Sequence, residues 1–192
     1  GDELIAATLT SGKAEILIGA REGKAIRFNE SAARAIGRTA AGVRGITVEG
    51  DDRVIGMVCM EPESSNDILV LSENGYGKRT DLEAYRITNR GGKGVKTMQV
   101  TEKTGKLISI QSVSDEYDLM IITRNGTTIR MAVADIRVMG RATQGVKLIN
   151  LRQGDSIASV MAVPKSDEND EEQVNGQDSA NPEQNGEIPE KD

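Results

Sequence analysis

A self-similar segment that recurs about every 51 residues constrains this chain more than any other feature. Its first half is an apolar run, a turn that ends in glycine and a short mixed strand, found at residues 15–28, 67–80 and 118–131. The turns carry the pairs Glu22-Gly23, Asn74-Gly75 and Asn125-Gly126. The two Asn-Gly pairs are strong signals for a two-residue hairpin turn, because both of its central positions need a positive φ, and Glu-Gly is a weaker one. The spacing predicts a repeat architecture.

The second half of the repeat is a Gly-Val element followed by a closing apolar run. The Gly-Val elements lie at 37–46, 89–98 and 140–149, and the closing runs at 54–60, 107–113 and 156–163. Two hairpin strands, a strand after Gly-Val and a closing strand give about four strands per unit, which is typical of a propeller blade. A fourth closing run lies at 4–10. We therefore expect an all-β, propeller-like fold of three blades (11–60, 64–113 and 114–163) plus one closing strand, as the C-terminal part of a longer array.

Charge divides the chain at Pro164. The whole sequence has a formal charge of −6, but residues 165–192 hold ten acidic and two basic residues, so residues 1–164 keep a net charge of +2. The segment 165–192 has almost no large apolar residue, and such composition does not bury enough surface to offset its ordering entropy. We expect one folded domain over 1–164 and a disordered acidic tail over 165–192.

Composition makes catalysis the less favoured class. The chain has no histidine and a single cysteine, Cys59, which excludes histidine-based acid–base pairs and the usual zinc ligand sets. No apolar stretch is long enough to span a bilayer. Aromatic residues make up 2% of the sequence, too few for a platform on which the bases of a single strand would stack. The sequence predicts no metal site, no catalytic residue and a cytoplasmic location.

Three positions hold a cation in every unit. They are Arg27, Arg79 and Arg130; Arg38, Arg90 and Arg141; and Arg44, Lys96 and Lys147. Equivalent positions in a blade array lie at equivalent places on its rim, so these cations would form regular basic steps suited to a bent polyanion. The alternative is that the Arg27 class is solvated at strand edges and the Arg38 class pairs with nearby acids.

The glycines of the Gly-Val elements fall into two groups. Gly42, Gly94 and Gly145 recur in every unit and indicate a backbone position that needs a positive φ or a close approach. Gly91 and Gly92, with Lys93 beside them, occur only in the middle unit. Their bared N–H groups, beside Arg90 and Lys93, are suited to a phosphate at short range. The stretch matches neither common nucleotide-binding loop.

The blade sequences resemble a known family. "EGKAIRFNESAARAIGRTAAGVRGI", "NGYGKRTDLEAYRITNRGGKGVKTM" and "VADIRVMGRATQGVKLI", with the acidic tail after them, closely resemble the C-terminal domain of the bacterial DNA gyrase A protein. The resemblance implies a six-bladed β-pinwheel whose blades exchange strands and around whose rim duplex DNA wraps. "TNRGGKG" (88–94) resembles half of the family's Gln-Arg-Arg-Gly-Gly-Lys-Gly-like wrapping loop, with Thr88-Asn89 where Gln-Arg would stand.

The function predicted is therefore a duplex-binding and wrapping module of DNA gyrase, an ATP-dependent type II topoisomerase that introduces negative supercoils. The resemblance implies as partners the rest of gyrase A together with gyrase B in a heterotetramer, with ATP and magnesium used elsewhere and no cofactor here. A topoisomerase IV C-terminal domain and a protein-interaction module remain alternatives. The DNA-contact residues expected are Arg27, Arg38, Arg44, Lys78, Arg79, Arg90, Lys93, Lys96, Arg130, Arg141 and Lys147.

Overall fold

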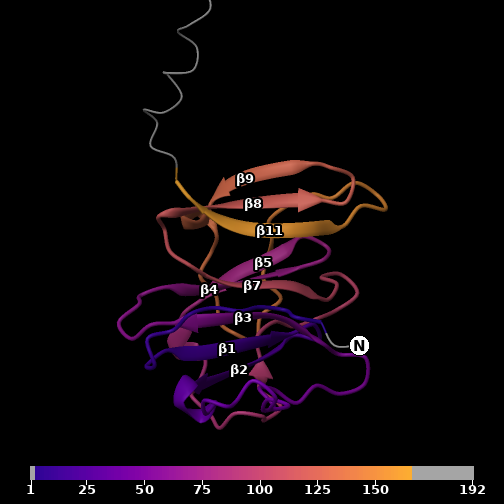
Figure 1. The fold of residues 1–192 in the computed structure, drawn as a ribbon. Helices are drawn as coiled ribbons and strands as arrows, with labels where there is room; N and C mark the ends of the chain where they lie inside the picture. Colours follow the sequence, from indigo (N-terminus) through magenta and orange to yellow (C-terminus); the bar gives the residue numbers. More distant parts are fainter. Residues whose placement is uncertain (1–2, 166–192) are drawn as a thin grey trace, which may run out of the picture.

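In the computed structural model, which describes residues 3–165, the chain forms three antiparallel β-sheets stacked along one direction (Figure 1). The first unit supplies β1 (Glu15–Ala20), β2 (Lys24–Asn29) and β3 (Val54–Met60). The second supplies β4 (Asp67–Ser72), β5 (Tyr76–Thr80), β6 (Val95–Lys96) and β7 (Leu107–Val113). The third supplies β8 (Tyr117–Thr123), β9 (Thr128–Ala132), β10 (Val146–Lys147) and β11 (Ile157–Pro164). The predicted all-β class is confirmed.

Each unit also contains one turn of 3-10 helix directly after its hairpin. These turns are η1 (Glu30–Ala32), η2 (Leu82–Ala84) and η3 (Val133–Asp135). The first two are capped by a preceding side chain: Asn29 accepts from the Ser31 N–H at 3.0 Å and Asp81 accepts from the Glu83 N–H at 2.8 Å. The acidic tail predicted over 165–192 lies outside the described residues, except for Lys165.

The hairpin turns are longer than predicted. Residues 21–23 and 73–75 form three-residue loops, and the third loop spans 124–127. Gly23, Gly75 and Gly126 take φ values of 86°, 83° and 84°. Neither Asn74 nor Asn125 has a positive φ, so the expected two-residue turn is wrong. A single left-handed glycine near the loop's end is enough to close a longer loop.

The short strand of each later unit joins the sheet of the unit before it. Strand β6 pairs with β2, so the first sheet has the order β3-β1-β2-β6, and β10 pairs with β5 in the order β10-β5-β4-β7. The third sheet has only β11-β8-β9 among the described residues, and its β9 edge is open at the corresponding place. Consecutive units therefore exchange strands, as the resemblance implied. We call the side of the sheets formed by β6 and β10 the exchanged-strand edge.

The predicted closing strand at 4–10 is not formed. These residues have no regular structure, and Leu4 and Leu9 are 87% and 98% exposed. In all three units the closing strand pairs with the first hairpin strand of the same unit, as β3 does with β1. Among the described residues no such hairpin precedes residue 4, so this segment has no equivalent strand to pair with there.

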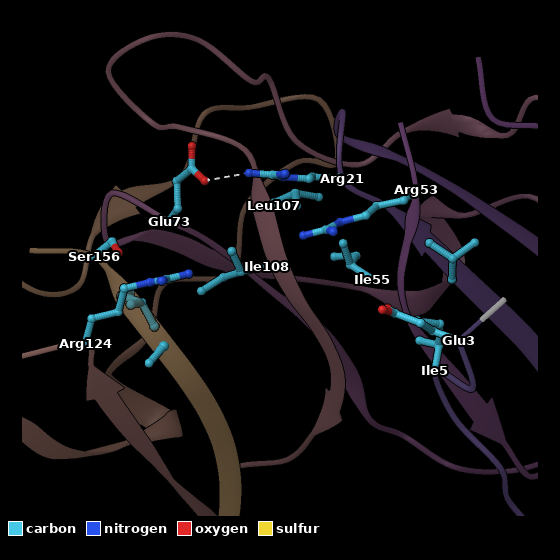
Figure 2. A pocket seen from close by; sticks show the side chains of 13 residues that line it. Glu3, Ile5, Arg21, Arg53, Ile55, Glu73, Leu107, Ile108, Arg124 and Ser156 are labelled. Atoms are coloured by element: carbon cyan, nitrogen blue, oxygen red, sulfur yellow. Dashed lines mark hydrogen bonds and ion pairs between the residues drawn. The ribbon is translucent and has the colours of Figure 1, made fainter. Parts of the chain in front are cut away.

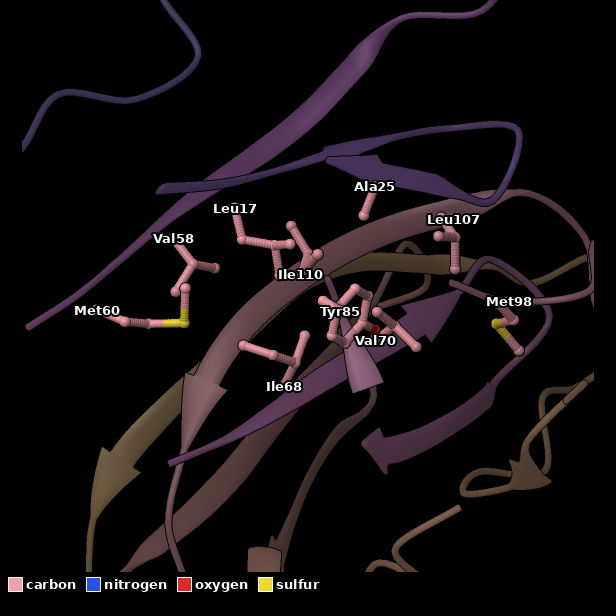
Figure 3. Packing of buried hydrophobic residues seen from close by; sticks show 10 residues of the cluster. All are labelled: Leu17, Ala25, Val58, Met60, Ile68, Val70, Tyr85, Met98, Leu107 and Ile110. Atoms are coloured by element: carbon pink, nitrogen blue, oxygen red, sulfur yellow. The ribbon is translucent and has the colours of Figure 1, made fainter. Parts of the chain in front are cut away.

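The core lies between the sheets rather than inside each one. Strand β4 is buried on both faces: Ile68 and Val70 pack toward the first sheet, and Leu69 and Leu71 pack toward the third. Figure 3 shows the first of these clusters, which joins residues of β1, β2 and β3 to residues of the second unit, among them the fully buried Tyr85. A strand with two buried faces needs a continuous apolar run, which explains the sequence "ILVL".

Candidate nucleic-acid interface

Arg27 and Arg79, two of the predicted DNA contacts, lie inside the protein. Their residues are 5% and 8% exposed. The Arg27 guanidinium donates to the Glu15 carboxylate at 2.6 Å and to the main-chain oxygens of Leu82 and Tyr85, both at 2.9 Å. It thus joins the hairpin of the first unit to η2 of the second.

Arg79 joins the hairpin of the second unit to the third unit in the same way. Its Nε donates to the Ile136 main-chain oxygen at 3.0 Å, beside η3, and its guanidinium also pairs with Asp115 and, at 3.6 Å, with Asp67. Burial raises the pKa of the Asp67 carboxyl, an effect that Arg79 opposes. The expectation that Arg27 and Arg79 are surface steps is wrong, because both guanidinium groups are used to join consecutive units.

Arg130, the third member of this class, is more exposed. Its side chain is 42% exposed, and its Nε donates to Asp118 at 2.7 Å. In the first two units the equivalent guanidinium reaches the 3-10 turn of the following unit. No unit follows the third one among the described residues, which accounts for the greater exposure.

Arg90 and Arg141 clamp main-chain carbonyl groups of the preceding unit. Arg90 donates to the Ala32 oxygen at 3.1 Å and to the Arg44 oxygen. Arg141 donates to the Ala84 oxygen at 3.1 Å and to the Lys96 oxygen. Both residues are half-buried. The salt-bridge alternative for this class is not observed at these two residues, because their partners are carbonyls.

Lys78 is also internal. It is fully buried, and its ammonium donates to the main-chain oxygens of Gly140, at 2.6 Å, and Arg141. Burial, and then the positive charge of Arg141, lower the pKa of Lys78 to about 8. The prediction that Lys78 contacts DNA is wrong, because its ammonium secures the neighbouring Gly-Val element to β5.

Six of the predicted cations remain exposed: Arg38, Arg44, Lys93, Lys96, Arg130 and Lys147. Lys96 lies on β6 in register with Lys24 of β2, and Lys147 lies on β10 in register with Tyr76 of β5. Lys103 adds a further cation at this second position, 5.4 Å from the centre of the Tyr76 ring. The exchanged-strand edge therefore carries cations on both complete sheets.

The repeated glycines allow the exchanged strands to approach their partners. Gly94 and Gly145 have φ values of 71° and 78°, and a Cβ atom on either would lie 2.5 Å from the Ala25 oxygen or 2.7 Å from the Gly77 oxygen. Gly42 has the same conformation, with a φ of 82°, but nothing lies within 4 Å of its Cβ position. The predicted positive φ and the predicted close approach of the backbone are therefore both found at Gly94 and Gly145, where a strand is exchanged.

The Gly91-Gly92-Lys93 loop rests on the first unit. The Gly91 N–H donates to the Gly45 oxygen at 2.7 Å, and the Thr47 N–H donates to the Gly92 oxygen at 2.9 Å. Lys93 forms an exposed ion pair with Glu49 at 2.6 Å, which raises the pKa of Lys93 and lowers that of Glu49. The loop is held by its backbone, and its charged side chain lies in solvent.

Sequence reasoning missed two further sets of cations. One is Lys24, which is partly buried and becomes a neighbour of Lys96 only through the strand exchange. The other is Arg34, Arg86 and Arg137, which are exposed in all three units. They are separated by 52 and 51 residues, so the spacing that revealed the other three classes would also have revealed this one.

A hollow of about 350 Å³ lies on the opposite side of the sheets, beside the closing strands β3, β7 and β11. Figure 2 shows Arg21, Arg53 and Arg124 around it, with Arg21 paired to Glu73 at 3.1 Å. Its lining combines these charges with apolar residues of the closing strands. Within residues 3–165 no group of three or more potential metal ligands occurs. No helix there is long and apolar enough to cross a membrane.

Comparison with known proteins gives the family. The model of the family described as "DNA gyrase C-terminal domain, beta-propeller" matches residues 14–59, 66–114 and 117–164. The DNA gyrase A protein of Staphylococcus epidermidis is 48% identical over 168 residues, and that of Staphylococcus aureus is 51% identical over 170. Each alignment covers 88% of this chain and 19% of the relative, so the chain spans about a fifth of their length.

Solved structures agree on the fold. A gyrase A C-terminal domain superposes with a TM-score of 0.72 at 22% identity, over 80% of this chain and 52% of that one. The C-terminal domain of a DNA topoisomerase IV gives 0.76, also at 22%, over 82% and 49%. The three units thus correspond to about half of either domain. By the match of all three repeats, this chain belongs to the DNA gyrase C-terminal domain family of β-propellers.

Proposed function

We propose that the chain is a non-catalytic module of a DNA gyrase A protein, and that it binds duplex DNA and bends it along the exchanged-strand edge. In the intact ATP-dependent topoisomerase this bending would support the introduction of negative supercoils. One observation carries the proposal: exposed cations lie on the same edge of two consecutive sheets, at Lys96 on β6 and Lys147 on β10. Regularly spaced cations on one edge are suited to a phosphate backbone.

The aromatic residues favour duplex over single-stranded DNA. Phe28 is 2% exposed and Tyr85 is fully buried, which removes two of the four aromatic side chains from the surface. Tyr76 lies under Lys103 on the exchanged-strand edge. Single strands are usually held by stacking several bases on aromatic rings. The surface therefore favours contacts to phosphate groups, with little dependence on base sequence.

The test is equilibrium binding of a mixed-sequence duplex of about 40 base pairs by the full chain between about 50 and 200 mM salt. With about five exposed cations at phosphates, log K should fall with log salt at a slope of about −4 to −5, since each phosphate contributes roughly 0.9. Changing Lys96 and Lys147 together to alanine should reduce the slope by about 2. A slope near zero for the unaltered chain would refute the proposal.

Two other functions make different predictions. A topoisomerase IV C-terminal domain has the same fold, but the curated relatives at 48% and 51% identity are gyrase A proteins, which favours gyrase. A protein-interaction module would bind a protein partner with little dependence on salt and would show little affinity for DNA. Under our proposal the partners are duplex DNA, the remainder of gyrase A and gyrase B, in the bacterial cytoplasm, and ATP and magnesium act in other domains.

A further inference from the structure

We propose that Arg86 binds a DNA phosphate in a hollow that it shares with Lys93. The inference rests on the proposed function and refines it, because it assigns to the duplex a cation outside the set predicted from the sequence. Arg90 precedes the Gly-Gly-Lys loop in the sequence, but its guanidinium donates hydrogen bonds to main-chain carbonyl groups of the first unit.

The hollow lies between the exchanged strand and the segment that follows η2. It has a volume of about 360 Å³, and its lining includes Arg86, Asn89 and Lys93, the glycines Gly92 and Gly94, and residues 25–27 of β2. The two cations thus border one space, which residues of β2 and β6 also line. Its volume is ample for a phosphate group, whose oxygens accept hydrogen bonds from guanidinium, ammonium and main-chain N–H groups.

The charges bordering this hollow are available. Arg86 is exposed and forms no hydrogen bond or ion pair through its guanidinium with any residue of the described range. Lys93 pairs with Glu49, and both of these side chains are more than half exposed. An exposed ion pair of this kind contributes little and exchanges readily for another anion.

Main-chain donors add to the cations. Within residues 3–165, the N–H groups of Gly92 and Lys93 donate no hydrogen bond to another residue, whereas that of Gly91 is bound to Gly45. Because Gly92 has no side chain, an anion can approach its N–H closely. This explains why the middle unit has glycine here, where the sister units have Ala40 and Thr143.

The segment that carries Arg86 is fixed before any ligand binds. The Thr88 N–H and hydroxyl both donate to the Arg27 oxygen, at 2.8 and 3.2 Å, and Ile87 bridges to the same strand. The third unit repeats this arrangement: the Met139 N–H donates to the Arg79 oxygen at 2.9 Å. A pre-positioned cation loses less entropy on binding than one on a mobile loop.

The three arginines follow the repeat, but their surroundings differ. Arg34, Arg86 and Arg137 are all exposed, one per unit. The position of Lys93 is taken by Ala41 in the first unit and Gln144 in the third. The middle unit therefore has the most complete phosphate site, and substitution of Arg86 should weaken binding more than substitution of Arg34 or Arg137.

The experiment measures duplex binding by the full chain against salt for R86A, R86K and a matched control, R124A. Arg124 is equally an exposed arginine, but it borders the hollow on the closing-strand side. We expect R86A to weaken binding about tenfold at about 100 mM salt and to reduce the slope by about 1, with R86K between it and the unaltered chain and R124A within about twofold of the unaltered chain. Circular dichroism should show that each variant keeps its fold.

The possible outcomes separate this inference from the proposed function. If R86A and R124A bind DNA equally well while alanine at Lys96 weakens binding, the assignment of Arg86 is overturned and the proposed function stands. If R86K binds as weakly as R86A, a simple charge contact is excluded and a two-pronged guanidinium contact is indicated, which keeps the assignment. If the unaltered chain shows no salt-dependent binding, both proposals are overturned.

Discussion

Lys78 carries a positive charge in the interior, where it donates to the main-chain oxygens of Gly140 and Arg141. Burial, followed by the Arg141 charge, lowers its pKa from 10.5 to about 8. The unfolded chain therefore binds more protons than the folded chain between about pH 8 and 10.5. Stability rises with pH wherever the unfolded state binds more protons, by up to about 1.4 kcal/mol per pH unit for one proton.

We predict that the free energy of unfolding of the unaltered chain increases between about pH 8 and 10 relative to that of K78M, which lacks the titrating group. Urea unfolding of both proteins at several pH values from about 7 to 10 would measure the difference. Below about pH 8 the cost of burying the charge is fully present, so the difference should be constant there. Parallel curves across the alkaline range would show that the folded-state pKa is not lowered.

The buried arginines show where residue-level prediction failed. A cation kept at the same place in every repeat is expected both for a ligand contact and for a brace between repeats, because both needs recur once per unit. Arg27 and Arg79 join consecutive units through buried guanidinium groups, whereas the carboxylates of Glu15 and Asp115 that they pair with are partly exposed. An exposed arginine can contact a ligand, whereas a buried one can only join the repeats. The sequence pattern does not reveal whether a single arginine is buried when its strand mixes polar and apolar residues.

At the scale of the element, the exchanged strands depend on two glycines. We predict that G94A and G145A destabilise the fold by about 3 kcal/mol or more, because each combines a strained positive φ with a collision against a main-chain oxygen. G42A has the same φ without the collision and should cost only about 1 kcal/mol. Urea unfolding of the three variants measures this difference. Equal losses would mean that the close approach of strand to strand contributes nothing.

Most of the elements were predictable from sequence, whereas their pairing was not. The hairpins followed from the apolar runs and turn glycines. The short strand followed from Gly-Val in the second and third units, whereas Gly42-Val43 of the first unit forms no strand. The pattern of Val95-Lys96 is the same whichever sheet it joins, so the exchange onto β2 was expected only from the family resemblance. The position of Lys24 beside Lys96 depends on that exchange and was missed for the same reason.

At the scale of the whole molecule, the acidic segment 165–192 is tethered to a domain with a net charge of +2. A tethered segment can reach an effective concentration in the mM range. We predict that deleting residues 165–192 tightens duplex binding several-fold at about 50 mM salt. A control in which the ten acidic residues become Asn or Gln at unchanged length should match the deletion. If both variants bind as the unaltered chain does, the segment does not compete with DNA.

Three units cover about half of the related gyrase domain, and the cations of β6 and β10 lie on two consecutive sheets. Under the proposed function, a duplex that follows these cations bends, at an elastic cost of several kcal/mol for a sharp bend, and the phosphate contacts offset that cost. Bending of the bound duplex therefore distinguishes a surface that wraps DNA from one that only binds it.

The most direct test is fluorescence energy transfer between dyes at the two ends of a duplex of about 40 base pairs, at about 50 mM salt. We predict that the full chain raises the transfer efficiency, and that changing Lys96 and Lys147 to alanine removes the increase. Salt-dependent binding with no change in the distance between the ends would contradict bending along the exchanged-strand edge.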